Sequence, residues 1–148
     1  MNPFKVIIFD LDETLVWHNE EGIASVYTEA NEILDSFSET NTPVYCVTWN
    51  RKPIDTMDDV GITWHFRAIY SCRGEKKSKF ILDIMSLHPE FKPHQFLFVD
   101  DKFSHLRDCI NHCPGVSICA ASKQHGITWE DLAVVSNMAL SSSESDEA

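Results

Sequence analysis

Two kinds of segment alternate along the chain: short continuous apolar runs, and longer stretches in which apolar residues recur every three or four positions. The runs are rich in β-branched and aromatic residues and too short for helices, which is typical of buried strands. There are five runs, at 5–9, 43–47, 68–70, 96–99 and 116–120. The spacing of three and four predicts amphipathic helices over 27–37, 80–85, 103–110 and 129–135.

The alternation of strands and helices predicts an α/β fold: a doubly wound, mostly parallel five-stranded sheet with helices on both faces. In such a sheet, ligands bind at the carboxyl ends of the strands, near the point where the strand order reverses. The polar residues that directly follow the apolar runs are therefore the first candidates for a site. They follow the first, second and fourth runs, and are Asp10, Asp12, Thr48, Asn50, Asp100 and Asp101.

Length and composition indicate one ordinary globular domain. The chain has 148 residues, of which 43% are hydrophobic, and this is enough to bury a core. We expect the domain to span residues 1–140. The remaining segment, 141–148 (SSSESDEA), is polar and acidic and has nothing to bury, so we expect a disordered tail there.

Cysteine usage and hydropathy bear on the cellular environment. The five cysteines are an odd number in mostly apolar surroundings, which favours reduced thiols over a disulfide framework. No apolar run is long enough to span a bilayer, and the first residues lack the cleavage pattern of a signal peptide. We therefore expect a soluble, cytoplasmic protein without a membrane partner.

The balance of charge restricts the partners. The net charge is −11, whereas tight binding of a nucleic-acid backbone is driven by clustered Lys and Arg. The charge therefore argues against a nucleic acid as the partner. A phosphorylated substrate, protein or small molecule, is compatible with it if a metal and a few local cations meet the phosphate.

The acidic residues at the strand ends have the chemistry of phosphoryl transfer. A carboxylate that attacks a phosphate needs a cation to offset the repulsion between the two groups. Asp10 and the Asp100–Asp101 pair would form an oxygen-rich cage without soft ligands, which suits Mg²⁺ as the cofactor. Asp12, two residues after the nucleophile Asp10, can protonate the leaving group and later activate water.

The transferred phosphoryl group also needs hydrogen-bond donors and a further positive charge. Thr48 and the backbone beyond it, at Trp49 and Asn50, can donate hydrogen bonds. Lys76 and Lys77, at the start of the helix before the fourth strand, are both candidates for the positive charge. Each element taken singly also has a structural explanation, as a turn or a helix cap. Their joint occurrence at strand ends, in this order, favours a phosphatase.

The same residues resemble the motifs of a known family. The stretch FDLDETLV, residues 9–16, resembles the first motif of the haloacid dehalogenase superfamily, whose phosphatase members carry Asp-x-Asp-x-Thr. Thr48 in VTWN resembles the second motif, Lys76 or Lys77 the third, and Asp100–Asp101 in FLFVDDK the fourth.

The resemblance implies a role for each of these residues. Asp10 would be the nucleophile and a metal ligand, while Asp12 would be the general acid and base, with its carbonyl oxygen on the metal. Thr48 would bind the phosphoryl group, and the third-motif lysine would neutralise it. One or both of Asp100 and Asp101 would complete the magnesium site.

Two further stretches bear on the subfamily. GVSICAASKQHGITWEDL, residues 115–132, resembles the last strand and helix of the magnesium-dependent phosphatase 1 group, which acts on phosphotyrosine proteins and sugar phosphates. ETLV, residues 13–16, instead resembles the small carboxy-terminal-domain phosphatases. The first resemblance slightly favours Lys76 as the phosphoryl-binding lysine, one helical turn before Phe80, although Lys77 is equally close to Ile81.

The spacing of the motifs leaves no room for a cap domain. The expected helices nearly fill the gaps between the motifs, so that a loop or hairpin around 17–23 is all that is left. An open cleft admits a phosphorylated macromolecule. Trp17 and Trp49 flank the first two motifs and would stack on a ring of the substrate if they are exposed, or pack in the core if they are not.

Other functions were weighed against the phosphatase. In a receiver-type signalling domain the acidic pair follows the first strand, so the order of motifs differs. A non-catalytic binding module would not need every group of the site, and a nucleic-acid 3′-phosphatase of the same superfamily fits the chemistry but not the charge. A zinc site is a further possibility on one predicted helix, from His105, Cys109, His112 and Cys113. The oligomeric state is left open.

Overall fold

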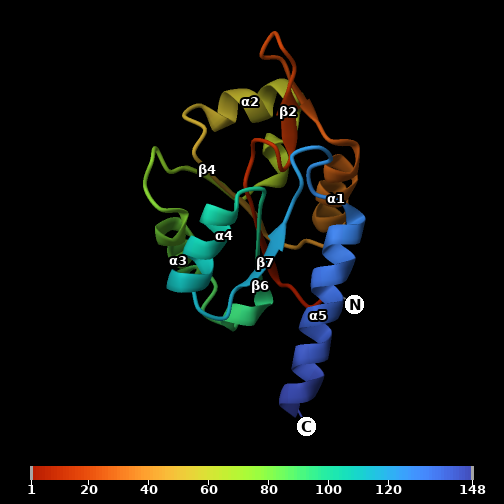
Figure 1. The fold of residues 1–148 in the computed structure, drawn as a ribbon, viewed down its shortest axis with the longest axis vertical. Coiled ribbons are helices and arrows are strands. Elements are labelled where there is room, and N and C mark those ends of the chain that lie inside the picture. Colours follow the sequence, from red (N-terminus) through yellow and green to blue (C-terminus); the bar gives the residue numbers. More distant parts are fainter. Residues whose placement is uncertain (1, 148) are drawn as a thin grey trace.

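The structure is a computed structural model that describes residues 2–147, with side chains described through residue 141. Its centre is one parallel sheet of five strands in the order β5-β4-β1-β6-β7 (Figure 1). The strands are β1 (Val6–Phe9), β4 (Val44–Thr48), β5 (Ala68–Ser71), β6 (Phe96–Asp100) and β7 (Ser117–Ala120). All five strands predicted from the apolar runs are confirmed.

Helices cover both faces of the sheet, as predicted, because side chains of successive strand residues point to opposite faces. Ile7 and Phe9 of β1 belong to one buried cluster, and Val6 and Ile8 belong to the other. The first cluster packs against α1 (Thr28–Glu39), α2 (Pro53–Val60) and α5 (Trp129–Glu147). The second packs against α3 (Lys77–Ser86) and α4 (Phe103–His112).

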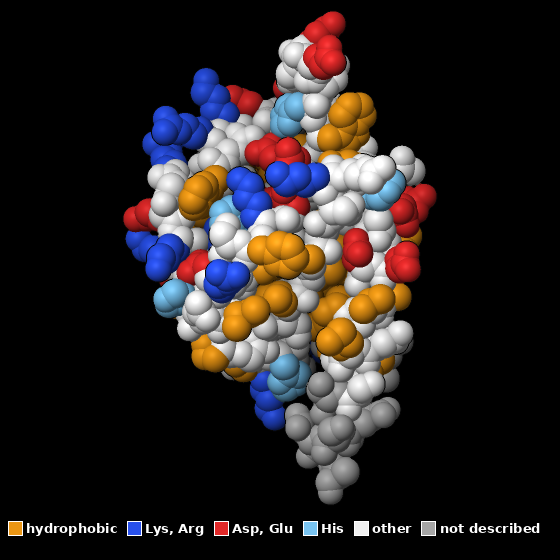
Figure 2. Space-filling view, in the orientation of Figure 1, with side chains coloured by type: hydrophobic (Ala, Val, Ile, Leu, Met, Phe, Trp, Pro, Cys, Tyr) orange, Lys and Arg blue, Asp and Glu red, His pale blue; other side chains and the backbone are white. Residues whose placement is uncertain are grey.

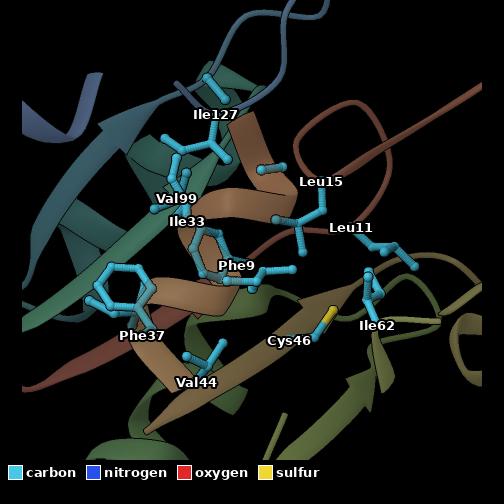
Figure 3. Close-up of a cluster of buried hydrophobic side chains, with 14 of the residues drawn as sticks. Phe9, Leu11, Leu15, Ile33, Phe37, Val44, Cys46, Ile62, Val99 and Ile127 are labelled. Atoms are coloured by element: carbon cyan, nitrogen blue, oxygen red, sulfur yellow. The ribbon is translucent and has the colours of Figure 1, made fainter. Parts of the chain in front are cut away.

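The first cluster fixes the end of β1 from which the site is built (Figure 3). Phe9 is fully buried and lies with its ring centroid 6.3 Å from that of Phe37 on α1. Leu11 and Leu15, which lie on either side of the turn after β1, are also fully buried. Burial of such side chains stabilises by about 1.5–3 kcal/mol each, so the turn that carries the acidic motif is held on both sides.

Beside the sheet, the chain forms a small antiparallel hairpin of β2 (Val16–His18) and β3 (Ala24–Val26). The sequence predicts a loop or hairpin there, and the hairpin is confirmed. The described chain carries no cap domain. None of its helices is long and apolar enough to cross a membrane.

Helix α2 lies between the second and third motifs, where a helix is expected to fill the gap but no residue range is predicted for it. Its buried residues are Pro53 and Met57 alone, four positions apart, which is too short a periodic pattern to detect. Pro53 suits the first turn of a helix, and Gly61 ends it in the left-handed conformation at φ 76°. Two short 3₁₀ helices, η1 (Thr63–His65) and η2 (Pro93–Gln95), were also not predicted.

Helix α5 is longer than the sequence predicts. Its backbone continues through Glu147, whereas a disordered tail is expected from residue 141. Once a helix is formed, each added residue gains a backbone hydrogen bond without a new nucleation cost, so packing of the first turns supports the extension. Ala148 lies outside the described residues, and the domain boundary at residue 140 stays a prediction.

Candidate active site

The chain order reverses between the two central strands, as a doubly wound sheet requires. From β1 the chain proceeds to β4 and β5 on one side, whereas β6 leads to β7 on the other. Asp10 directly follows β1, and Asp100 is the last residue of β6. The Asp10 amide donates a 2.9 Å hydrogen bond to the Val99 carbonyl, which holds the two strand ends together at this point.

Three carboxylates meet there. Each of Asp10, Asp100 and Asp101 offers an oxygen that lies within 4.8 Å of the other two. Within residues 2–147 this is the only such group of three or more potential metal ligands. The structure thus brings together the first and fourth motifs, as the sequence predicts.

One lysine lies between the carboxylates, and it is Lys77. Its Nζ donates hydrogen bonds of 2.7 Å to Asp10 Oδ1 and to Asp100 Oδ2, and its side chain is 0% exposed. Lys76 is exposed and precedes α3 as its N-cap. The structure thus places Lys77 among the carboxylates, and not Lys76, which the sequence slightly favoured. Lys77 shares the buried helix face with Ile81 and Ile84, four and seven positions on.

Burial and an excess of acidic groups over basic ones shift the pKa values in the carboxylate cluster. Burial raises the pKa of Asp10 despite the opposing charge of Lys77. Burial and the closeness of Asp10 and Asp100 raise the pKa of Asp101 to about 8. Burial also acts on Asp100, but hydrogen bonds from His105 and Lys77 overcome it and lower the pKa to about 2. One ammonium thus offsets only part of the negative charge of three carboxylates.

The donor set fits a divalent cation. Both carboxylate oxygens of Asp101 are buried and have no hydrogen-bond partner among the described residues. An unpaired buried carboxylate is costly, and a cation between Asp10 and Asp101 would relieve that cost. The ligands are all oxygens, which is the set that Mg²⁺ prefers.

Asp12 lies on the open side of the site. Its side chain is 38% exposed, and its Oδ1 is 3.4 Å from Asn50 Nδ2 and 3.8 Å from His18 Nδ1. Glu13 adopts a positive φ of 63°, and the chain turns back so that the buried Thr14 Oγ1 donates a 3.2 Å hydrogen bond to Asp10 Oδ2. The threonine of the Asp-x-Asp-x-Thr pattern therefore orients the Asp10 carboxylate, a role that sequence analysis did not assign.

The second motif faces the first. Thr48 is 1% exposed, and its Oγ1 accepts a 3.0 Å hydrogen bond from the Asn50 amide. Ser71 Oγ donates to the Asn50 carbonyl at 2.7 Å, so that Asn50 is anchored on one side while its side chain reaches Asp12. The Asn50 amide is thus already engaged, which leaves the Thr48 hydroxyl hydrogen available to a ligand.

Trp49 is half exposed and forms one wall of the site. Its ring centroid is 4.9 Å from that of His105, and its Nε1 donates to the Glu75 carbonyl at 3.0 Å. The His105 Nδ1 in turn lies 3.0 Å from Asp100 Oδ2. His105 thus links Trp49 to the carboxylates. Sequence analysis missed this role, although a histidine five residues after Asp100, on the first turn of a helix, is a usable signal.

The zinc site considered on this helix does not form. Cys109 and Cys113 are fully buried in the second cluster, and His105 points to Asp100. His112 is exposed and lies with its Nδ1 3.0 Å from Asp108 Oδ1. The two cysteines pack together in the core, whereas His105 and His112 each lie against a different aspartate.

Comparisons with known proteins agree on the fold. No known family model and no curated protein sequence matches the chain. A haloacid dehalogenase-like hydrolase from Streptococcus pneumoniae matches in structure with a TM-score of 0.67 at 17% identity, over 91% of this chain and 92% of its own. A hydrolase of the same superfamily from Ehrlichia chaffeensis matches with a TM-score of 0.67 at 14% identity, over 95% and 98%.

A third similar structure contains ligands. It is a member of the same family from Bacteroides thetaiotaomicron, an Asp-to-Ala mutant in complex with magnesium and inorganic phosphate. It matches with a TM-score of 0.62 at 13% identity, over 87% of this chain and 98% of its own. The chain thus has the fold of the haloacid dehalogenase-like hydrolases, without a cap domain among its described residues.

Proposed function

We propose that this protein is a magnesium-dependent phosphatase that hydrolyses a phosphomonoester through an aspartyl-phosphate (acyl phosphate) intermediate on Asp10. The observation that carries the proposal is the carboxylate cluster. Three carboxylates lie close together, and the buried Lys77 donates hydrogen bonds to two of them, Asp10 and Asp100. The third, Asp101, has two buried oxygens without a hydrogen-bond partner among the described residues. This excess of negative charge is explained if a cation and a phosphate complete the site. The magnesium and phosphate in the Bacteroides thetaiotaomicron structure support the same chemistry.

Two hydrogen bonds fix the orientation in which the Asp10 carboxylate would attack phosphorus. Thr14 and Lys77 each hold one of its oxygens, so that the carboxylate has a fixed orientation. In the first step an Asp10 oxygen forms a bond to phosphorus as the bond to the leaving oxygen breaks, and Asp12 transfers a proton to that oxygen. In the second step Asp12 takes a proton from the water that attacks phosphorus, which releases phosphate and restores Asp10.

Asp10, Asp101 and the Asp12 carbonyl would hold the magnesium ion. Asp100 already accepts hydrogen bonds from Lys77 and the Lys102 amide, and it lies against His105, so its role is to orient Lys77. Magnesium, when bound, offsets the negative charge of the phosphoryl oxygens and of the nucleophile.

Lys77 and Thr48 would bind the transferring phosphoryl group. Lys77 stays protonated, because the charges of Asp10 and Asp100 raise its pKa against the effect of burial. A fixed cation in a water-excluded site stabilises developing charge without reorganisation.

We further propose that the substrate is a phosphoprotein, for instance a phosphotyrosine segment, or a sugar phosphate. The open edge of the sheet carries the exposed rings of Trp17 and Trp49, which suit an extended or cyclic substrate. The five cysteines are all buried free thiols, which supports a cytoplasmic location.

A turnover screen tests the proposal. Wild type and Asp10→Asn are compared on phosphopeptides, sugar phosphates and 3′-phosphorylated oligonucleotides, with magnesium and with excess chelator. We expect wild type to release phosphate from a phosphopeptide or sugar phosphate only with magnesium, and Asp10→Asn to release none. Release that survives the substitution or the chelator would contradict the proposal, as would no release from any substrate. The best turnover on the oligonucleotides would contradict the substrate class.

A further inference from the structure

The edge of the sheet that holds the carboxylates also carries a group of exposed basic side chains, here called the basic rim. Its members all lie in the loops after the strands and are Arg51, Lys52, Arg73, Lys76, Lys102 and Lys123. They are half of the 12 Lys and Arg of a chain with 23 Asp and Glu. Figure 2 shows basic side chains gathered over this part of the molecule. The positive charge is therefore distributed unevenly.

Three members of the basic rim are N-caps. Lys52, Lys76 and Lys102 precede α2, α3 and α4, and none of them makes a side-chain capping hydrogen bond. Ser, Thr, Asp and Asn are the favoured N-cap residues, and a cation is unfavourable at the positive end of a helix. These lysines therefore do not serve the stability of their helices.

Most side chains of the basic rim form no ion pair with a carboxylate of the described chain, so their positive charge can interact with a ligand. Lys123 pairs with Glu13 at 3.4 Å. Among the described residues, the other five members have no ion pair within 4.0 Å with a carboxylate. The chain has nearly two acidic residues for every basic one, yet these five basic side chains lack a carboxylate partner within the part of the chain that the structure describes. This arrangement points to a ligand that carries negative charge.

A groove connects the basic rim to the carboxylates. It has a volume of about 290 Å³, lies between the start of α3 and the length of α4, and is lined by Lys77 and Trp49. Lys76 also lines it, together with Ser104, Asn111 and Asp108, whose carboxylate accepts hydrogen bonds from Ser78. A group attached beside the transferred phosphate can therefore extend along this groove and meet Lys76.

We infer that the substrate carries a second anionic group beside the transferred phosphate, and that Lys76, with Lys52 and Lys102, binds it. The inference rests on the proposed phosphatase activity and adds its substrate class: a phosphopeptide with Asp or Glu next to the phosphorylated residue. Of two adjacent lysines, Lys77 then serves the chemistry and Lys76 the selection of the substrate.

A peptide fits the surface better than an oligonucleotide does. The basic rim lies in loops around the site and forms no stripe leading away from it, so it can meet a few charges close to the phosphate. The exposed Glu20 and Glu21 lie between β2 and β3, at the tip of the hairpin, which Figure 2 shows as acidic. An oligonucleotide carries a charge at every nucleotide and would be repelled by that tip.

The test uses three phosphopeptides that differ only in the residues flanking the phosphorylated one: acidic, neutral or basic. The measured quantity is the ratio of kcat/KM between the acidic and the neutral peptide, for wild type and for Lys76→Gln, Lys52→Gln and Lys102→Gln. Lys92→Gln is the matched control, because Lys92 is an exposed N-cap lysine of η2, before β6 and thus at the opposite edge of the sheet.

We expect wild type to prefer the acidic peptide, by up to about fivefold for each charge pair, and to lose the preference as salt is added. Lys76→Gln should reduce the ratio most, and Lys92→Gln should leave it unchanged. Turnover of all three peptides at equal rates overturns the inference but leaves the phosphatase intact. An equal effect of Lys92→Gln, or better turnover of a 3′-phosphorylated oligonucleotide than of the acidic peptide, also overturns it. Turnover of a sugar phosphate but of no peptide also overturns the inference and leaves the phosphatase intact. If no substrate of any class is turned over, the proposed function has failed first.

Discussion

Two polar clusters of this protein, each formed around a buried side chain, differ in whether their polar atoms are paired. In one, His65 lies with Nδ1 2.6 Å from Ser38 Oγ and Nε2 3.5 Å from Asp35 Oδ1, under the stacked ring of Trp64. Each ring nitrogen has its own partner. In the other, at the carboxyl ends of β1 and β6, three carboxylates share one lysine, and both oxygens of Asp101 lack a partner.

The difference separates a structural cluster from a functional one. Ser38 and Asp35 lie on the ring nitrogens opposite to those they would occupy in a Ser-His-Asp hydrolase triad, and the cluster joins α1 to η1. A balanced cluster stabilises the fold and has no unmet need for a ligand. In the carboxylate cluster, burial and surplus negative charge raise the pKa of Asp101 to about 8, and a bound cation would offset that charge. Charge imbalance is the feature that distinguishes the site.

The largest expected effect is the loss of turnover in Asp10→Asn. The amide is a poor nucleophile, and the substitution removes one negative charge from a crowded cluster, so the midpoint of thermal unfolding without magnesium should not fall. Steady-state assays and thermal melts measure the two effects.

Ser38→Ala provides the contrast in the balanced cluster. It leaves a His65 nitrogen unpaired, which should lower the free energy of unfolding by about 1–3 kcal/mol and spare kcat. If Ser38→Ala lowered turnover as much as Asp10→Asn, the division between the two clusters would be wrong.

Asp12→Asn should cost about 10²–10⁴-fold in kcat, the range of general acid–base catalysis. The loss should be smaller for an aryl phosphate with an acidic leaving group, because that group departs without a proton. Comparing kcat for a series of leaving groups measures this. Equal losses across the series would remove Asp12 from proton transfer.

Lys77→Gln should lower kcat by about 10²–10³-fold, as removal of a fixed electrostatic donor does. It also leaves Asp10 and Asp100 without their shared cation, so the protein should unfold at lower denaturant and be partly rescued by magnesium. Lys76→Gln should show a much smaller loss of kcat on an aryl phosphate and no change in the denaturation midpoint. Similar effects of the two variants would argue against the assignment of Lys77.

Magnesium alone should raise the midpoint of thermal unfolding. A ligand at about one hundred times its dissociation constant adds about 2.7 kcal/mol to the stability. The shift should largely vanish in Asp101→Asn, which removes one unpaired carboxylate, and persist in Ser38→Ala. Calorimetry with and without chelator measures it, and an undiminished shift in Asp101→Asn would place the cation elsewhere.

The smallest effect belongs to the balanced cluster and concerns pH. Burial lowers the pKa of His65, against the opposing charge of Asp35. The unfolded chain therefore binds more protons than the folded one just below the usual histidine pKa of about 6.5, so the free energy of unfolding should fall as the pH drops through that window.

His65→Gln should make this fall shallower without abolishing it, because burial also lowers the pKa of His88. Denaturant titrations from about pH 7 to about pH 5 measure the slope. An unchanged slope in His65→Gln would mean that His65 has the same pKa in the folded and the unfolded chain.

The sequence predicted the sheet and the acidic residues well, because each depends on a local pattern. Five apolar runs gave five strands, and the residues after them lie together since parallel strands end at one edge. It predicted no residue range for α2, whose short buried face gives no periodic signal. It favoured Lys76 over Lys77, because the direction of one helix relative to the sheet decides which lysine points inward.

Two features of the site can be recognised only in the three-dimensional structure. His105 acts through Asp100 and Trp49, which come from different segments, so that the sequence can signal its link to Asp100, five positions earlier, but not its link to Trp49. The net charge of −11 does not reveal the basic rim, because it sums over the whole chain and does not record that basic side chains gather at one edge of the sheet.

The central claim is that Asp10 becomes phosphorylated during turnover. The most direct measurement is mass spectrometry of the peptide containing Asp10, from wild type quenched with acid while it turns over an aryl phosphate in magnesium. We predict a phosphate adduct on Asp10 that hydroxylamine removes, that forms as fast as turnover requires and that is absent with chelator. Rapid turnover with no adduct on Asp10, or with the adduct on another residue, would contradict the account.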